Sequence, residues 1–468
     1  MGAAPAVDRA DRFYAAVRLI ARFWLWFFFK GVEVRRADRV PPRGPVLLCI
    51  NHPNNLIDSL LVGAVQSRKV HYLVTSALFR NPIVARFLGA CGAIPVYRKQ
   101  DDPARMDRNT ETFSACFRTL EGGRLIGIYP EGTTHSEARV QRIKTGAARI
   151  ALEYEARRLA HAGAPLALIP VGLTFEARKS FRGRVRVSFG EPVPVTPYLD
   201  AYRQDAVKAV DALTTAIQWA MESEILHVDR VERAGLVRVI EELYRGDLAR
   251  ELHEERGFSP KQIDTFRLSQ AIADAVAHFE DREPERVERI ARQVQHYRAM
   301  LAAYRVRDQA VRARLLPRPV RGRLQHSWQA SAGLPLFAYG AAVNFLPYVL
   351  PRWLARRTAG KETSYATTRL LAGIVAFPLF WGLETWVVWR LGGAAWAAAF
   401  ALSLPLSGLV AYRYLGGMAR LRSQLGFGVL SLTRHHAASR LLAARREIVA
   451  ELERAKTDYL AATKGSTF

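Results

Sequence analysis

The stretch Asn51–Asp58, which reads Asn-His-Pro-Asn-Asn-Leu-Ile-Asp, decides the fold because it joins two segments of different periodicity. The apolar run Val46–Ile50 before it predicts a buried strand, and the apolar residues of Leu56–Val65 recur at helical spacing. Pro53 suits a turn or an early helical position, and either of the two asparagines after it can cap the helix. This order predicts an α/β layer, in which ligands bind at the loops that follow the strands.

His52 and Asp58 carry the chemistry of this stretch. A neutral imidazole can accept a proton from an alcohol, while a carboxylate on its other ring nitrogen fixes the tautomer and stabilises the imidazolium. Six steps of about 100° along one helix would leave the two side chains far apart, so a pair requires His52 in the loop and Asp58 in the first helical turn. The alternative interpretation is a histidine that caps or packs a helix end.

Three further blocks follow in order, Gly92–Arg98, Tyr129–Thr134 and Ile169–Gly172. Each block alone is a weak signal. Together with the His52 block, over about residues 40 to 195, they resemble the phospholipid/glycerol acyltransferase family, which includes lysophosphatidate and glycerol-3-phosphate acyltransferases. The resemblance implies an α/β core with a mixed sheet and helices on both faces.

The resemblance implies that His52 is the general base and that Asp58 is its orienting acid. One departure stands out, because the family pattern has four residues between the two and this chain has five, Pro53–Ile57. The Pro-Asn-Asn turn can absorb the extra residue. No cofactor is implied, since the acyl group comes from acyl-CoA or an acyl-carrier protein as co-substrate.

The resemblance also implies an acceptor site. Arg98 would bind the acceptor phosphate, for which a guanidinium is well shaped, and Glu131, Gly132 and Thr133 would hold the acceptor. Lys144 opens the next predicted helix, where its ammonium and the backbone N–H groups can meet an anion. Without the resemblance, Arg98 reads as a surface arginine and the Pro-Glu-Gly-Thr segment as a plain turn.

Length and cysteine usage bound the class of protein. A chain of 468 residues allows two or three domains. The three cysteines, Cys49, Cys91 and Cys116, lack metal-ligand spacing, so we expect neither a disulfide framework nor a metal site, and a reducing compartment. Cys49 and Cys91 lie in apolar contexts that are typical of small core residues.

The formal charge of +25 and the pI near 10.5 call for an acidic partner. Nucleic acid is one candidate, but the arginines are dispersed and no helix-turn-helix or zinc motif is apparent. An anionic lipid surface explains both the charge and the long apolar stretches, and the implied thioester and lysophosphatidate are anionic too. We therefore expect an anionic membrane and no nucleic acid as partner, with a compositional bias as the alternative. The sequence leaves the oligomeric state open.

Apolar segments near both ends predict membrane contact. Residues 13–29 are apolar except for Arg18 and Arg22 on one helical face, which predicts an interfacial membrane helix with its arginines at the headgroups, or alternatively a core helix. Leu370–Trp389 and Leu391–Tyr412 are each long enough to span the bilayer, and Arg390–Gly393 between them predicts a tight turn. Residues 331–351 are uncharged but contain three prolines, which favours a re-entrant or interfacial element.

Basic residues flank the predicted hairpin on its outer ends, which by the positive-inside rule are cytoplasmic, as is the catalytic core. They are Arg352, Arg356, Arg357, Lys361 and Arg369 before it and Arg413, Arg420 and Arg422 after it.

The predicted organisation is thus an interfacial helix within residues 1–35, an acyltransferase core over 36–200, a charged helical extension over 201–330, a membrane region over 331–415 and a cytosolic helix over 416–468. The predicted function is a membrane-bound O-acyltransferase that moves an acyl chain from a thioester to a hydroxyl of lysophosphatidate or glycerol 3-phosphate, in phospholipid synthesis or remodelling. Two alternatives are an inactive lipid-binding scaffold that keeps the fold and, less favoured, a membrane-anchored nucleic-acid-binding protein.

Overall fold

A computed structural model describes residues 9–98, 107–135, 140–161, 163–175, 183–225, 231–256, 265–315, 320–360 and 362–463. The chain divides into two compact units. The first consists of Met1–His227 with Leu350–Val375, and the second of Val228–Val349 with Ala376–Phe468. Helices α12 (Val320–Thr358) and α13 (Glu362–Thr433) contribute residues to both units.

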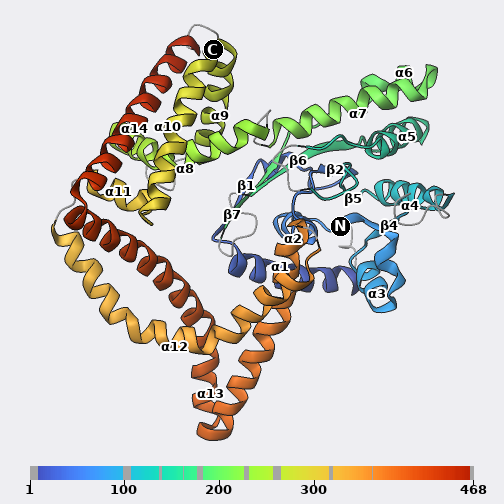
Figure 1. Ribbon diagram of the computed structural model, residues 1–468. Helices are drawn as coiled ribbons and strands as arrows, with labels where there is room; N and C mark the ends of the chain where they lie inside the picture. Colours follow the sequence, from blue (N-terminus) through green and yellow to red (C-terminus); the bar gives the residue numbers. More distant parts are fainter. Residues whose placement is uncertain are drawn as a thin grey trace. The chain divides into compact units, whose positions relative to one another are not determined.

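The first unit is built on a seven-stranded sheet with the strand order β1-β7-β6-β2-β5-β3-β4 (Figure 1). All neighbouring strands are parallel except β6 and β7, which are antiparallel, so the mixed α/β sheet expected from the sequence is confirmed. The strands are β1 Gly31–Arg35, β2 Val46–Ile50, β3 Val70–Thr75, β4 Ile94–Val96, β5 Leu125–Ile128, β6 Ala167–Phe175 and β7 Arg184–Phe189.

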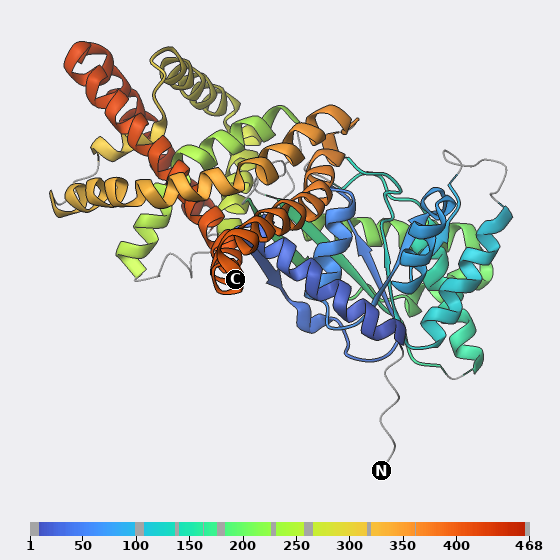
Figure 2. The ribbon, with the colours of Figure 1, turned by 90° about the horizontal axis from the view of Figure 1, so that it is seen from below.

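Helices cover both faces of the sheet (Figures 1 and 2). One face carries α1 (Arg9–Phe28), α2 (Leu56–Val65) and α3 (Pro82–Ala90), and the other carries α4 (Asn109–Glu121), α5 (Gly146–His161) and α7 (Ala206–Ser223), which the short α6 (Leu199–Gln204) precedes. Helix α7 begins beyond residue 200, where we expected the core to end. It nevertheless belongs to the first unit, because Leu213 and Ile217 are buried in the same apolar cluster as residues of β2 and β5.

The two arginines of helix α1, which we predicted to contact lipid headgroups, form hydrogen bonds with the neighbouring helix α2. Arg18 donates to the backbone carbonyls of Gln66 and Ser67, and Arg22 donates to the carbonyl of Ala64. These carbonyls lie at the C-terminal end of α2, where helix geometry leaves acceptors unpaired and the helix dipole favours cations. The two arginines therefore bond to the C-terminal end of α2, while Arg18 stays half-buried and Arg22 exposed, and their contact with lipid headgroups stays a prediction.

The other face of α1 remains apolar and open. Leu19, Ile20 and Trp26 are 70%, 55% and 55% exposed, while Trp24 and Phe28 from the same helix are buried. Helix α1 thus combines a core face with an exposed apolar face, and contact of that face with a membrane stays a prediction.

The second unit is helical over the part of the chain that the structure describes. It contains α8 (Val231–Arg256), α9 (Thr265–Arg282), α10 (Pro284–Ala303), α11 (Asp308–Leu315) and α14 (His435–Thr463), in agreement with the charged helical extension. The buried Arg445 of α14 donates to carboxylates of Asp247 in α8 and Asp308 in α11, both at 2.8 Å. Two carboxylates around one buried guanidinium satisfy its charge, which a lone buried arginine would leave unpaired.

Two apolar stretches within the described helices, Gly333–Thr358 and Ser364–Leu415, are long and apolar enough to cross a membrane. Residues 331–351 lie inside the continuous helix α12, so their prolines do not interrupt it as we had expected. Helix α13 folds back at Gly393, which has φ 82° and ψ −179°, within the segment predicted as a turn (Figure 1). Large apolar side chains on both sides of that turn, such as Val375 and Leu402, are 66% and 75% exposed.

The cysteines yield a test of the packing. Burial raises the pKa of Cys49 in β2 and of Cys116 in α4 to about 12, and it also raises that of Cys91. Because the thiolate is the nucleophile, only about one thiol in 10⁴ at a pKa of 12 is reactive at pH 8. We expect Cys49 and Cys116 to resist iodoacetamide in the native protein and to react after denaturation, as measured by peptide mass spectrometry. Rapid native labelling of Cys49 would contradict the buried position of β2.

Candidate active site

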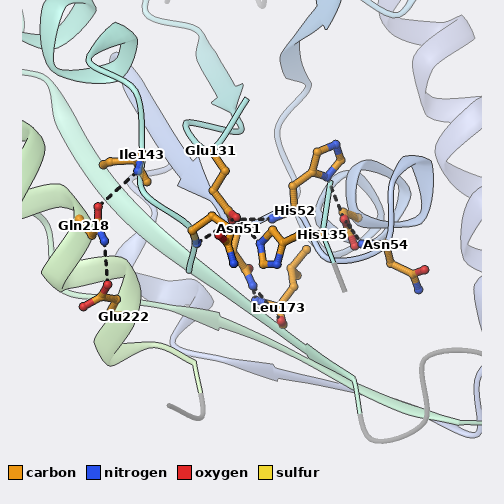
Figure 3. Close-up of polar contacts among 11 residues, drawn as sticks. Asn51, His52, Asn54, Glu131, His135, Ile143, Leu173, Gln218 and Glu222 are labelled. Carbon is orange, nitrogen blue, oxygen red and sulfur yellow. Dashed lines mark hydrogen bonds and ion pairs between the residues drawn. The ribbon is translucent and has the colours of Figure 1, made fainter. Parts of the chain in front are cut away.

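The loop between β2 and α2 begins with a residue that ties two strands together. The side-chain amide of Asn51 donates to the carbonyl of Leu173 in β6 at 3.1 Å, and its oxygen accepts from the N–H of Leu173 at 2.7 Å (Figure 3). Asn51 is buried. The carboxyl end of β2 is therefore held in place where His52 leaves the sheet.

His52 and Asp58 meet across this loop. His52 Nδ1 lies 2.9 Å from Asp58 Oδ2, and the histidine side chain is 16% exposed while that of the aspartate is fully buried. Asp58 lies in the first turn of α2, so the pair has the loop-to-helix geometry that the sequence required. A carboxylate only accepts hydrogen bonds, hence Nδ1 donates, and the lone pair of the neutral imidazole lies on Nε2.

The extra residue of this loop is accommodated without separating the pair. Asn55 takes the N-cap position of α2 at φ 55° and ψ −131°, but its side chain makes no capping hydrogen bond, contrary to our expectation. Asp58 Oδ2 instead accepts from the backbone N–H of Asn54 at 2.7 Å. A positive φ is uncommon for a residue other than glycine, and this one stands at the point where the loop enters α2.

Glu131 supports the His52 loop from the end of β5. Its Oε1 accepts from the backbone N–H of His52 at 3.0 Å, its Oε2 accepts from the N–H of Gln141 at 3.2 Å, and it also pairs with the His135 side chain (Figure 3). Glu131 is 3% exposed. Protein groups thus engage both carboxylate oxygens, and a direct contact between Glu131 and an acceptor stays a prediction.

Two cationic side chains meet at the turn after Glu131. Arg98 Nη1 donates to the carbonyl of Gly132 at 3.0 Å. Gly132 has φ +70°, and a Cβ added there would lie 2.7 Å from Lys144 Nζ. Thr133 is exposed in the same turn. The predicted acceptor-site residues Arg98, Gly132, Thr133 and Lys144 therefore lie together beside the carboxyl end of β5.

Sequence reasoning missed the role of Tyr129, although it opens the third block. Its ring stacks on the His52 imidazole, with the ring centroids 3.9 Å apart and the planes 17° apart. Its hydroxyl lies 2.7 Å from Ser59 Oγ. Burial and then the Asp58 carboxylate raise the pKa of Tyr129 well above its ordinary value, so the phenol stays neutral. An aromatic residue at the end of an apolar run, just before Pro-Glu-Gly, was the available signal.

A second missed contact comes from far along the chain. Thr367 Oγ1, near the start of α13, donates to the carbonyl of Asn54 at 3.0 Å. No spacing rule connects two residues 313 positions apart.

Among the described residues, no group of three or more His, Cys, Asp or Glu side chains is placed to hold a metal ion.

Sequence comparison relates this part of the chain to known proteins. Residues 31–174 match the Acyltransferase family model. The chain is 33% identical over 298 residues to glycerol-3-phosphate O-acyltransferase 2 of Saccharomyces cerevisiae, covering 41% of this chain and 40% of that protein. It is 26% identical over 108 residues to 1-acyl-sn-glycerol-3-phosphate acyltransferase of Bacillus subtilis, covering 23% of this chain and 50% of that protein.

A solved structure, that of the 1-acyl-sn-glycerophosphate (LPA) acyltransferase from Thermotoga maritima, aligns with a TM-score of 0.31 and 16% identity over 45% of this chain and 82% of that one. The chain spans half or less of the length of the two curated relatives named above. All four blocks begin within residues 31–174, and the His52–Asp58 pair lies inside that range. This part of the chain is therefore a domain of the Acyltransferase family.

Proposed function

We propose that the protein transfers an acyl chain from a thioester to a hydroxyl of a glycerophosphate acceptor. The observation that carries the proposal is the 2.9 Å contact between His52 Nδ1 and the buried Asp58 carboxylate, at the carboxyl ends of β2 and β5 in an acyltransferase domain. This is the arrangement that a general base needs, with one ring nitrogen oriented and the other able to take a proton.

The proposed reaction needs no covalent intermediate on the enzyme. The acceptor hydroxyl oxygen forms a bond to the thioester carbonyl carbon while its proton passes to His52 Nε2. The Asp58 carboxylate stabilises the resulting imidazolium across the Nδ1 hydrogen bond. The tetrahedral intermediate then expels the thiolate as the carbon–sulfur bond breaks, and the imidazolium returns the proton to the sulfur.

Arg98 and Lys144 supply the proposed binding site for the acceptor phosphate. Both lie at the Gly132 turn, one residue from Glu131, whose carboxylate accepts from the N–H of His52. A guanidinium binds phosphate in bidentate fashion and an ammonium adds a point charge. A phosphate held there would leave a neighbouring glycerol hydroxyl to reach the imidazole.

The relatives are named for two different acceptors, glycerol 3-phosphate and its 1-acyl derivative. A panel that combines acyl-CoA or acyl-carrier protein as donor with glycerol 3-phosphate, lysophosphatidate or a phosphate-free monoacylglycerol tests the proposal. We expect acyl transfer to at least one phosphate-bearing acceptor. Equal transfer to the phosphate-free acceptor would contradict the assigned phosphate site.

Replacing Arg98 with methionine should weaken acceptor binding selectively. Loss of one charge-assisted interaction is worth about 1.5–3 kcal/mol, so the KM for the phosphate acceptor should rise about 10- to 100-fold, with a smaller change in the KM for the thioester. Arg118→Met, at an exposed position of α4, is the matched control. Steady-state kinetics with each substrate varied in turn separates the two KM values, and an unchanged acceptor KM would remove Arg98 from the site.

Membrane attachment is the second part of the proposal. The exposed apolar residues of α1, α12 and α13, together with a net charge of +25, support binding at an anionic leaflet with the catalytic domain on the cytoplasmic face. A lipid acceptor or product would then stay in the bilayer during turnover. Flotation with phosphatidylglycerol vesicles, compared with phosphatidylcholine vesicles, tests the electrostatic part.

A further inference from the structure

We propose that Thr367 is a positioning residue, which holds the turn between His52 and Asp58 from the start of α13. This inference rests on the proposed function. Thr367 Oγ1 donates to the carbonyl of Asn54 at 3.0 Å, and the bond is buried. Both residues belong to the first unit, although 313 positions separate them.

Most helical threonines among the described residues bond within their own helix. Thr367 is an exception, as is Thr112, which donates to the carbonyl of Pro95. The hydroxyls of Thr358, Thr433 and Thr457 each donate to the carbonyl four residues earlier in their own helix. That local bond is the ordinary choice for a threonine within a helix. Thr367 donates across the domain instead, to a loop that carries the proposed catalytic pair.

The start of α13 is packed into the first unit around this contact. Ala366, Thr367, Arg369 and Leu370 are 1%, 7%, 8% and 2% exposed, whereas Leu371 is 44% exposed. Arg369, one of the basic residues that flank the predicted hairpin, is thus buried in protein. The segment leading into the predicted membrane hairpin is therefore part of the wall around the proposed catalytic loop.

Backbone hydrogen bonds hold the turn at Asn54. Asn55, the next residue, has φ 55° and no side-chain cap, and the buried side-chain amide of Asn54 makes no hydrogen bond to any described residue. The position of Asn54 therefore depends on its backbone. Its N–H donates to Asp58 Oδ2, and its carbonyl accepts from Thr367.

These two bonds connect Thr367 to the catalytic pair through one residue. Asp58 Oδ2 accepts both from the N–H of Asn54 and from His52 Nδ1. If the Asn54 carbonyl is released, the turn can relax, and the carboxylate oxygen that orients the imidazole moves with it. Small errors in the orientation of a base slow the chemical step more than they weaken substrate binding.

The test compares Thr367→Val, which removes the hydroxyl at similar volume, with Thr367→Ser, which keeps it. Thr433→Val is the matched control on the same helix, since that hydroxyl bonds only its own helix in the described contacts. With the full chain in detergent, labelled acyl-CoA and the best acceptor of the panel, we expect Thr367→Val to lower kcat about tenfold with each KM within about twofold. Thr367→Ser and Thr433→Val should stay within about twofold of wild type.

A double-mutant cycle separates positioning from general stability. In an Asp58→Asn background the carboxylate that the loop positions is already gone, so Thr367→Val should lower kcat by less than about twofold further. Equal effects in both backgrounds would overturn the inference, as would wild-type kcat in Thr367→Val. If Thr367→Val does not accumulate as folded protein, the ratio of kcat between Thr367→Ser and Thr367→Ala carries the same comparison.

His52→Ala, assayed in parallel, separates a failure of the proposed acyltransferase function from a failure of the proposed role of Thr367. Full activity in His52→Ala would overturn the proposed function itself. Loss of activity in His52→Ala together with an unaffected Thr367→Val would overturn only the role of Thr367.

Discussion

Replacing His52 with alanine is expected to lower kcat about 10²- to 10⁴-fold, because it removes the imidazole that Asp58 orients to take the acceptor proton. The residual rate would come from binding of both substrates in proximity. Release of free thiol from acyl-CoA, measured with and without acceptor, reports the change directly. Because the side chain is only 16% exposed and stacks on Tyr129, the urea midpoint of the variant should be measured beside its activity.

The control for this variant is His296→Ala, at an exposed position of α10 in the second unit. It should retain wild-type kcat. Activity in His52→Ala within tenfold of wild type would show that the base lies elsewhere and would contradict the mechanism that we propose.

Asp58→Asn should lower kcat by about two to four orders of magnitude while the protein stays folded. The amide has the shape of the carboxylate, and its oxygen can still accept from the N–H of Asn54. It lacks the negative charge that stabilises the imidazolium formed when His52 takes the proton. In the serine-protease triad, the same Asp-to-Asn change lowers kcat by about four orders of magnitude. Steady-state kinetics at saturating substrates measures the fall.

Asp200→Asn, at an exposed position of α6, is the matched control and should be close to wild type. Asp58→Ala should also lose stability, because it leaves the N–H of Asn54 without its buried acceptor, at about 1–3 kcal/mol. A urea midpoint that falls in Asp58→Ala but not in Asp58→Asn would confirm that the side chain at position 58 stabilises the fold separately from its effect on kcat. A kcat for Asp58→Asn within a few-fold of wild type would contradict the pairing.

The strand and helix around the site could be predicted because local patterns specify them. The apolar run of β2 and the helical repeat of α2 begin and end where periodicity indicated, at Val46–Ile50 and Leu56–Val65. The pairing of His52 with Asp58 was implied by the family resemblance, and helix geometry added that such a pair requires a loop-to-helix junction. The turn at Gly393 was likewise readable from a Gly-Gly pair between two apolar runs.

Other features depend on contacts between distant segments. The hydrogen bonds of Arg18 and Arg22 require the C-terminal carbonyls of α2 nearby, and an amphipathic pattern does not reveal such a neighbour. The prolines of α12 signalled a break, yet the helix is continuous, because a proline removes one backbone donor and neighbouring groups can compensate.

The sequence alone determined the α/β layer, the loop-to-helix junction that holds the imidazole and the carboxylate, and the length of the apolar segments near the carboxyl end. All of these features depend on residues that are close to one another along the chain. Tertiary structure alone decided that Glu131 turns inward to His52, that Tyr129 stacks on the imidazole and that Thr367 reaches Asn54. The physical reason is that a hydrogen bond or ring contact depends on distance in space, and sequence separation carries no information about it once the chain folds back on itself.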